Sequence, residues 1–420
     1  MTDTAETGTA AGTGSVAGLG SAGTAEPDAS TRAGAAQARV RPNARMLLLL
    51  ATGHLTVDSM QGALPAVLPA LRAAHGLTYE AAGLIVLLAN ITSSVIQPAF
   101  GYLSDRSARR WLLPWAVVFA TVGFAFTGLA PSYRVVLALT VLAGLGVAAY
   151  HPEGYKTASS VAGDWKATGV SWFTVGGNIG IALGPPLVTL YLGTFGLGGT
   201  LAMSAHGLLV AALLFAAQPY LARESAARKA PAGTAAPTMV GAMVLLVGVV
   251  MVRSWTQLGF TTYVPFYYVD YLKAEPWLVG PLLFVFLGAG ALGTLVGGPL
   301  ADRFGPRRFA VAAFAAATPL AVSFMLTSGW IHFVILGALG FVLVSTFTTS
   351  VVLAQAYLPR HHGMASGLIV GLAIGAGGIG AWVLGWVADR WDLTTALWVA
   401  AVVPAAGFVT ALFLPEPRRG

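Results

Sequence analysis

The sequence contains no cysteine and few charged residues. Without cysteine, the chain can form no disulfide bond, no zinc–thiolate site and no thiol nucleophile. Charged residues make up 9% of the chain, whereas a soluble domain has about 25%. So few charges cannot cover a surface that faces water, and the composition therefore excludes an ordinary soluble globular protein.

The signatures of catalysis are also missing. The sequence has no Ser/His/Asp nucleophile arrangement, no paired catalytic carboxylates and no nucleotide-binding loop. His361 and His362 are adjacent, but two ligands do not make a metal site. We therefore expect that the protein is not an enzyme and binds no metal ion or cofactor. Because no nucleotide-binding loop is present, we expect that any work the protein does across a membrane is driven by a proton gradient rather than by ATP.

Apolar residues are abundant, at 56% of the chain. They form runs of about 20 residues or more, the length that crosses a bilayer as a helix. A transmembrane β-barrel would instead alternate apolar and polar residues. We predict an all-α polytopic membrane protein with twelve transmembrane helices, near residues 46–71, 78–103, 110–130, 133–156, 166–193, 198–222, 238–271, 276–301, 307–327, 330–354, 363–388 and 394–414.

A charged turn occurs twice between apolar runs. Gly101-Tyr-Leu-Ser-Asp-Arg-Ser-Ala-Arg-Arg110 returns as Gly298-Pro-Leu-Ala-Asp-Arg-Phe-Gly-Pro-Arg-Arg308. The repeat predicts two parallel six-helix halves with a site at the midplane between them. The predicted organisation is a disordered cytoplasmic tail over 1–44, an N-terminal half over 45–222, a cytoplasmic linker over 223–237, a C-terminal half over 238–415 and a cytoplasmic tail over 416–420.

The basic residues predict the orientation of the helices. Cytoplasmic segments of membrane proteins carry an excess of lysine and arginine. Of the 23 lysines and arginines, only Arg72, Arg134, Lys273 and Arg390 fall in the segments predicted to lie outside, and Arg253 falls within a span. We therefore expect a multi-pass protein of the cytoplasmic (inner) membrane with both termini in the cytoplasm. The net charge of +7 reflects this orientation and not a nucleic-acid partner.

The first span carries a polar face. His54, Asp58 and Gln61 recur at steps of four and three, which places them on one side of a helix. A carboxylate within a span is costly and usually faces a wet cavity. We predict that Asp58 and His54 carry a coupling proton and that Gln61 contacts substrate. The alternative is that His54 and Asp58 form a structural pair near a membrane end.

Two further spans carry polar candidates. Asn90 and Gln97 lie on one face of the second span, where they either line a substrate cavity or join helices by hydrogen bonds. In the fourth span, His151 and Glu153 flank Pro152, which is expected to bend the helix. We predict that these two residues form an inner gate with proton exchange. The alternative is an ordinary solvated helix end.

Arg253 lies about half-way along the seventh span. Arginine cannot easily lose its proton there, so it needs a partner or a wet cavity. Gln257 follows on the same face, and Tyr268 lies further out. A fixed guanidinium with hydrogen-bonding neighbours suits an anionic substrate such as a carboxylate or phosphonate. The alternative is an ion pair with Asp58 across the two halves.

The repeated turns are predicted parts of a gate. An acidic residue at a helix end can meet the positive N-terminus of a neighbouring helix, and such contacts would close the cytoplasmic side. The alternative is loop charge for orientation alone. The predicted gate residues are Asp105, Arg106, Arg110, Asp302, Arg303 and Arg307.

Glycines four residues apart predict close helix packing in the fifth span of each half. They are Gly176, Gly180 and Gly184 in the first half, and Gly367, Gly371 and Gly375 in the second.

Several of these strings resemble a known family. The charged turns resemble the loop motif of the major facilitator superfamily, and Gly180-Ile-Ala-Leu-Gly-Pro185 resembles part of its antiporter motif. Within that superfamily, the chain resembles the fosmidomycin resistance protein family, through His54-x(3)-Asp58-x(2)-Gln61, Gln97-Pro98, His151-Pro-Glu153, Val175-Gly-Gly-Asn-x-Gly180 and Gly377-Gly-Ile-Gly-Ala381. The resemblance implies the major facilitator fold, proton-driven export of a small phosphonate drug, and a substrate contact at Asn178. Thr174 stands where that family usually has glutamine.

The expected function is secondary active transport by a monomer in the lipid bilayer. We expect export of a small anionic drug, such as a fosmidomycin-like phosphonate, in exchange for protons. One alternative keeps the fold but reverses the task, as proton-coupled uptake of an organic anion or sugar. Another alternative is a membrane sensor or scaffold. The sequence argues against it, because it contains no effector domain.

Overall fold

The computed structural model describes residues 41–106, 111–163, 165–223, 238–359, 362–373 and 375–416. Most of both predicted tails, nearly all of the predicted linker and the gate residue Arg110 lie outside the described residues. For Asp105 and Arg106 the structure gives the helical backbone only.

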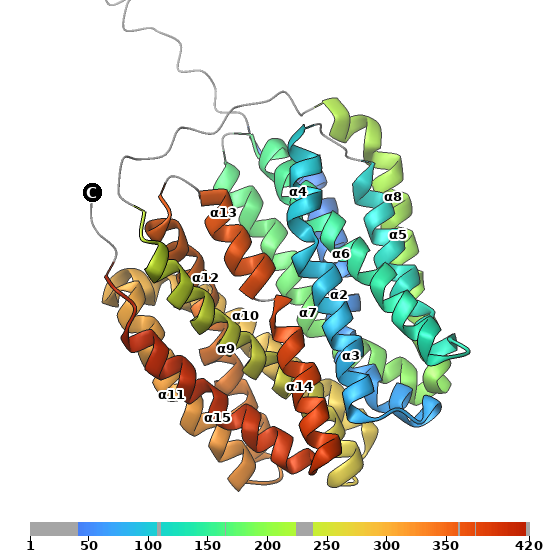
Figure 1. The fold of residues 1–420 in the computed structure, drawn as a ribbon. Helices are drawn as coiled ribbons and strands as arrows, with labels where there is room; N and C mark the ends of the chain where they lie inside the picture. The colour runs from blue at the N-terminus through green and yellow to red at the C-terminus, as the bar shows by residue number, and fades with distance from the viewer. Residues whose placement is uncertain are drawn as a thin grey trace, which may run out of the picture. The chain divides into compact units, whose positions relative to one another are not determined.

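Every regular element of the described chain is a helix (Figure 1). Short π-helical or 3₁₀ turns (η) continue or interrupt several of the α-helices. The elements are α2 (Ala44–His75), α3 (Tyr79–Asn90), η1 (Ile91–Val95), α4 (Gln97–Arg106), α5 (Leu112–Ala125), η2 (Thr127–Leu129), α6 (Tyr133–Val161), α7 (Lys166–Phe195), η3 (Gly196–Met203), α8 (Ser204–Arg223), α9 (Val240–Phe266), η4 (Tyr267–Tyr271), η5 (Pro276–Leu278), α10 (Val279–Phe304), α11 (Pro306–Leu326), α12 (Ile331–Tyr357), α13 (His362–Gly367), η6 (Leu368–Ala373), α14 (Gly377–Arg390) and α15 (Leu393–Leu412).

The helices have the length and composition expected of membrane spans. Ten stretches of the described chain are long and apolar enough to cross a bilayer. One of them, Gly169–Leu221, covers both α7 and α8. Helix α2 has 32 residues and is therefore also long enough, although its polar face makes it less apolar. These assignments are consistent with the twelve predicted spans and confirm the all-helical membrane fold.

Side-chain caps set where several helices begin. The oxygen of Asn43 accepts a hydrogen bond from the Met46 amide at 3.3 Å, and the hydroxyl of Thr78 accepts one from the Ala81 amide at 3.1 Å. Such caps satisfy amide groups that lack a partner in the first helical turn. Gly76 ends α2 with φ at 61°, a left-handed conformation that glycine adopts without strain.

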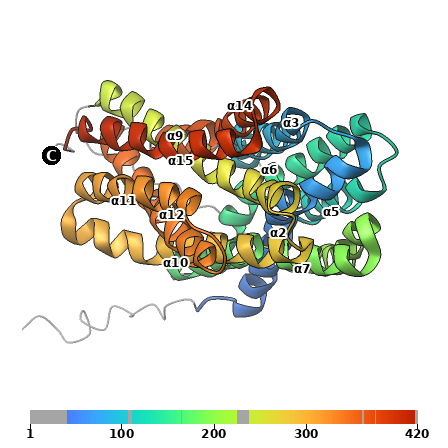
Figure 2. The ribbon, with the colours of Figure 1, turned by 90° about the horizontal axis from the view of Figure 1, so that it is seen from below.

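Helices α2 and α7 pack closely through glycine (Figures 1 and 2). A Cβ atom added at Gly176, Gly180 or Gly184 would lie 2.2 Å from a backbone carbonyl oxygen of α2. These carbonyl groups belong to Ala51, Leu55 and Ser59, respectively. The fifth-span glycines therefore serve the close packing that their spacing predicts.

The corresponding glycines of the second half do not form an equivalent contact with described residues. A Cβ at Gly367 would meet no described atom within 4 Å, and one at Gly371 would lie 3.3 Å from the Ser94 carbonyl oxygen. The close glycine packing of this half lies instead between α10 and α12, where Cβ atoms at Gly293 and Gly297 would meet backbone carbonyl groups at 2.2 and 2.3 Å. The π-helical turn η6 follows Gly367 and breaks the helical register on which the four-residue spacing depends.

The two halves meet at the end of the bundle that the sequence places outside the cell, here called the outer end. There, one hydrophobic core contains residues of both halves, such as Val67 and Phe260, whereas two other cores each belong to a single half. Four hydrogen bonds join the two halves at this end. The described contacts therefore close the outer end.

Two aspartates of the C-terminal half form these hydrogen bonds. Asp270 in η4 accepts from Arg72 at 3.1 Å and from the Tyr79 hydroxyl at 3.0 Å. Asp389 in α14 accepts from the backbone amides of Tyr79 and Glu80, at 2.9 and 2.7 Å. These two amides belong to the first turn of α3, so Asp389 acts as a helix cap supplied by the opposite half. Helices α3 and α14 lie side by side in both ribbon views (Figures 1 and 2).

Candidate functional site

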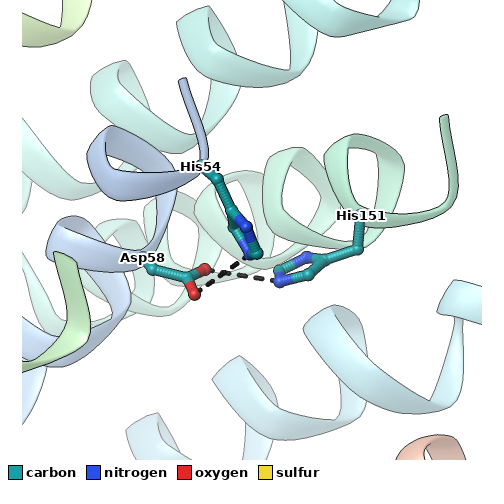
Figure 3. A group of neighbouring side chains, drawn as sticks. All are labelled: His54, Asp58 and His151. Carbon is teal, nitrogen blue, oxygen red and sulfur yellow. Dashed lines mark ion pairs between the residues drawn. The ribbon is translucent and has the colours of Figure 1, made fainter. Parts of the chain in front are cut away.

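Three ionisable side chains meet inside the N-terminal half. His54 and Asp58 come from α2, and His151 comes from α6 (Figure 3). The Nε2 atom of His54 lies 3.3 Å from Oδ2 of Asp58, and the Nε2 atom of His151 lies 3.4 Å from Oδ1 of the same carboxylate. Asp58 is only 8% exposed. The two imidazole rings thus flank one buried carboxylate, and we call these three residues the proton cluster.

Backbone carbonyl groups hold both rings of the proton cluster. The Nδ1 atom of His54 lies 2.7 Å from the carbonyl oxygen of Phe173 in α7, and the Nδ1 atom of His151 lies 2.8 Å from that of Val147. Because a carbonyl oxygen can only accept, Nδ1 carries a hydrogen in each ring. Both Nε2 atoms are therefore directed at Asp58.

Gly177 and an aromatic wall give the proton cluster its shape. A Cβ added at Gly177 of α7 would lie 2.5 Å from His54 Nε2 and 2.7 Å from Asp58 Oδ2, so any larger residue would overlap the cluster. The ring of Phe173 stacks on that of His54 with centroids 4.1 Å apart. The ring centroids of Tyr150 and Tyr155 lie 6.2 and 6.0 Å from that of His54. These contacts fix the imidazole orientation.

Arg253 lies in the C-terminal half, on α9, and is 3% exposed. Its Nη1 donates to the side-chain oxygen of Gln257 at 3.1 Å, and its Nη2 lies 3.5 Å from the Ser254 hydroxyl. The ring of Phe347 lies 5.9 Å from the guanidinium carbon. Its Nε finds no hydrogen-bond partner, and the guanidinium makes no ion pair in the described chain. The expected alternative, a pair between Arg253 and Asp58, is not formed, because Asp58 lies between the two histidines.

The sequence profile of the Major Facilitator Superfamily matches residues 50–378 and, in an overlapping match, residues 289–420. The chain belongs to the major facilitator superfamily. It is a transporter of that superfamily and a multi-pass membrane protein.

Two curated relatives cover nearly the whole transporter. The uncharacterized MFS-type transporter YfnC of Bacillus subtilis (strain 168) is 33% identical over 383 residues, which are 89% of this chain and 93% of the relative. The Fosmidomycin resistance protein of Escherichia coli (strain K12) is 31% identical over 401 residues, which are 94% of this chain and 98% of the relative. The resemblance of the sequence strings to this family is thus confirmed over most of the chain.

Solved structures support the fold. A bacterial homologue of the human lysosomal transporter Spinster, in an inward-facing and unoccupied conformation, matches with a TM-score of 0.67 at 16% identity, over 89% of this chain and 95% of that one. A mutant of the nucleoside transporter NupG matches with a TM-score of 0.72 at 12% identity, over 88% and 99% of the two chains. Both confirm the major facilitator fold.

The other predicted polar residues of the N-terminal half are distributed over several helices. Gln61 borders a cavity of about 30 Å³ within the N-terminal half, together with Ser93. Asn90 is buried, and its amide donates to the Val86 carbonyl of its own helix at 2.9 Å. Gln97 begins α4, and Asn178 lies on α7; both are half-buried. Glu153 is buried in α6, so it is not a solvated helix end. Substrate contact by these residues stays a prediction.

Tyr268 has a side-chain partner within the C-terminal half. Its hydroxyl lies 2.7 Å from Nδ1 of His332, whose Nε2 lies 2.8 Å from the Thr327 carbonyl oxygen. Because that carbonyl must receive the ring hydrogen, Nδ1 accepts from the tyrosine. The structure thus gives Tyr268 a hydrogen bond within the C-terminal half, and its predicted role in substrate binding stays a prediction.

The predicted inner gate is partly described. Asp302 and Arg303 are exposed at the end of α10. Arg307 donates to the Leu412 carbonyl oxygen at 2.7 Å and lies 3.8 Å from Glu416, so it holds the end of α15. The latch role of these turns stays a prediction.

Sequence reasoning missed Gly177 and the two aspartates of the outer end. Gly177 stands in the Gly-Gly-Asn string, but only the helix crossing shows that it faces His54. Asp270 and Asp389 each close a predicted span at the outer end, where the sequence has few lysines and arginines. A carboxylate at the end of a span is the signal that could have drawn attention to them.

The proton cluster also has donor types that divalent metals use. Its three donor atoms lie within 4.8 Å of one another, fewer than the four that close a structural zinc site but as many as an open site takes from protein. Each Nε2 can equally bind a proton directly.

Proposed function

We propose that this transporter exports a small anionic compound, such as a fosmidomycin-like phosphonate, in exchange for protons. The observation that carries the proposal is Arg253, a buried guanidinium without an ion pair in the described chain. A fixed charge in a low-dielectric site is costly unless an anion neutralises it. A phosphonate supplies oxygen atoms that match the guanidinium fork.

The proton cluster supports proton coupling. Histidine is the side chain whose charge changes most readily near neutral pH, and here two histidines share one buried carboxylate. Protonation at this cluster in one half and anion binding at Arg253 in the other would favour different arrangements of the halves, as alternating access requires.

The direction of transport rests on similarity. The relative from Escherichia coli is named for resistance to fosmidomycin, and resistance is the effect of removing a drug from the cell. We place the protein in the cytoplasmic membrane with both termini inside, working as a monomer without a cofactor.

Proton flux in everted membrane vesicles tests the proposal. Vesicles containing the transporter are energised, and fosmidomycin is then added while lumen pH is recorded. We expect drug-dependent alkalinisation of the lumen, because protons leave as the drug enters. Asp58→Asn should abolish it, whereas Glu275→Gln, at an exposed carboxylate of the outer end, should not. Acidification would indicate symport, and an unchanged pH would refute fosmidomycin as the substrate.

A further inference from the structure

The proton cluster has a definite number of positions that protons can enter. In each of its two imidazole rings, Nδ1 already carries the hydrogen that the backbone carbonyl of Phe173 or Val147 accepts. The remaining positions are the Nε2 atoms of His54 and His151 and the oxygens of Asp58. The carbonyl groups thus leave one open ring nitrogen on each histidine.

The two open ring nitrogens face different oxygens of the same carboxylate. His54 Nε2 lies 3.3 Å from Oδ2, and His151 Nε2 lies 3.4 Å from Oδ1. An unprotonated Nε2 has a lone pair and can only accept a hydrogen bond, and so can an ionised carboxylate oxygen. Without added protons, each of the two contacts therefore places two acceptors together with no hydrogen between them. One added proton gives one carboxylate oxygen an imidazolium partner at ion-pair distance, and a second added proton does the same for the other oxygen. Two added protons therefore replace both acceptor–acceptor contacts with ion pairs.

No basic side chain of the described chain pairs with the cluster. The titratable side chains on the elements around it are Tyr150, Tyr155 and the buried Glu153 of α6, and His206 of α8, which lies 3.3 Å from the hydroxyl of Ser59. Phe173 and Gly177, the α7 residues that touch the cluster, are uncharged. No lysine or arginine of the described chain forms an ion pair with Asp58.

We propose that the transporter exchanges two protons for each substrate molecule, one carried on Nε2 of His54 and one on Nε2 of His151, with Asp58 as their shared partner. The inference rests on the proposed function in requiring that proton movement be coupled to transport. It goes further by fixing the stoichiometry and assigning each proton to an atom.

The stoichiometry can be measured as a null point. Purified transporter is placed in vesicles with the membrane potential held at zero, a pH difference of about one unit is imposed, and the fosmidomycin gradient that stops net proton flux is found. Each coupled proton contributes about 1.36 kcal/mol per pH unit, so two protons balance a gradient of about 100-fold and one proton a gradient of about 10-fold. Both pH values are chosen so that fosmidomycin keeps one charge state.

Glutamine variants assign the two protons. Glutamine at position 151 can still donate an N–H group to Asp58 but cannot take up a proton. His151→Gln should move the null point from about 100-fold to about 10-fold per pH unit, and His54→Gln should do the same. His206→Gln, outside the cluster, should keep the wild-type value. Fosmidomycin binding by each purified variant confirms that it is folded.

The possible results separate the two proposals. A wild-type null point near 10-fold would overturn the two-proton assignment while leaving proton-coupled export intact. A null point unchanged in His151→Gln would show that this histidine carries no transported proton. A null point that changes when a metal chelator is added would replace the proton assignment with a metal. Absence of proton flux in the wild type at every drug gradient would overturn both proposals.

Discussion

The first helix of each half carries a buried ionisable site, and the two sites differ in how their charge is partnered. On α2, Asp58 is enclosed by two histidines, so its charge has partners that can themselves gain or lose protons. On α9, Arg253 has a permanent charge and only neutral hydrogen-bond partners in the described chain. The first site is suited to changing its protonation and the second to holding an anion. The two halves share the repeated charged turn but carry ionisable sites of different chemistry.

Of the substitutions considered, replacing Arg253 should have the largest effect, and the effect should be on anion binding. Arg253→Ala removes charge-assisted hydrogen bonds worth about 1.5–3 kcal/mol each, so fosmidomycin binding should weaken about 10- to 100-fold. The affinity of Arg253→Lys for fosmidomycin should lie between those of the wild type and Arg253→Ala, because lysine keeps the charge but not the planar fork. Calorimetric titration of the purified variants measures the effect.

Arg308→Ala is the matched control for the loss of an arginine. Arg308 is exposed on α11, so its removal should leave binding unchanged. Wild-type affinity in Arg253→Ala would show that the anion binds elsewhere, and the contrast between the two halves would then fail.

Gly177→Ala should disturb the proton cluster, the ionisable site of the N-terminal half. The added methyl group would overlap His54 and Asp58, and overpacking of this kind costs about 1–3 kcal/mol. We expect drug-driven proton flux to fall severely while fosmidomycin still binds at Arg253. Gly193→Ala on the same helix is the control, because a Cβ there meets no described atom within 4 Å. Normal proton flux in Gly177→Ala would contradict the proposed role of the cluster geometry.

Asp389→Ala should affect both sites equally and more weakly, because it acts on the contact between the halves. Loss of a helix cap costs about 0.5–2 kcal/mol, which corresponds to a change of about 2- to 30-fold in the ratio of open to closed outer ends. Spin labels on cysteines introduced at Ala73 and Trp391, both exposed, would report this ratio as a shift towards longer distances. The natural chain adds no cysteine of its own to the labelling.

Glu275→Ala is the control for this experiment. Glu275 is an exposed carboxylate of the outer end without a hydrogen bond or ion pair in the described chain. The distance distribution should therefore stay as in the wild type. If Asp389→Ala leaves the distances unchanged as well, the cap does not contribute to closure.

Asp392→Ala should have the smallest effect and touch neither site. Asp392 lies between α14 and α15, and its hydrogen bonds from the Thr394 hydroxyl and the Thr395 amide lower its pKa. Because the folded pKa is lowered, the stabilisation is present above the ordinary aspartate value of about 4 and is lost as the pH falls through the folded value. At neutral pH we expect a loss of about 0.5 kcal/mol, since the site is exposed. Thermal unfolding should show a lower Tm at neutral pH and no difference in strong acid.

Periodicity predicted the pairing of His54 with Asp58 and the buried position of Arg253, because both depend on one helix alone. It did not predict that His151 joins Asp58. The fourth span was expected to form a gate, and the rotation of α6 relative to α2 depends on packing that spacing does not encode. The Asp58–Arg253 alternative failed for the same reason, since partners on different helices are set by the tertiary fold.

Tyr268 shows a second physical limit. Its expected place further out from Arg253 assumed a continuous α-helix, but residues 267–271 form the π-helical turn η4. A π turn adds a residue to the turn and rotates everything after it. The same kind of turn at η1 and η6 interrupts the second and eleventh spans, where the sequence gives no proline within the turn to mark it.

The hydrogen bonds at the outer end also have a kinetic meaning. In each turnover they must break before the outer side can open, so they add to the activation barrier of that step. A contribution of about 1 kcal/mol to a barrier changes a rate about fivefold. The speed of the cycle can therefore be adjusted at Asp270 and Asp389, at residues that contact neither the proton cluster nor Arg253 in the described chain.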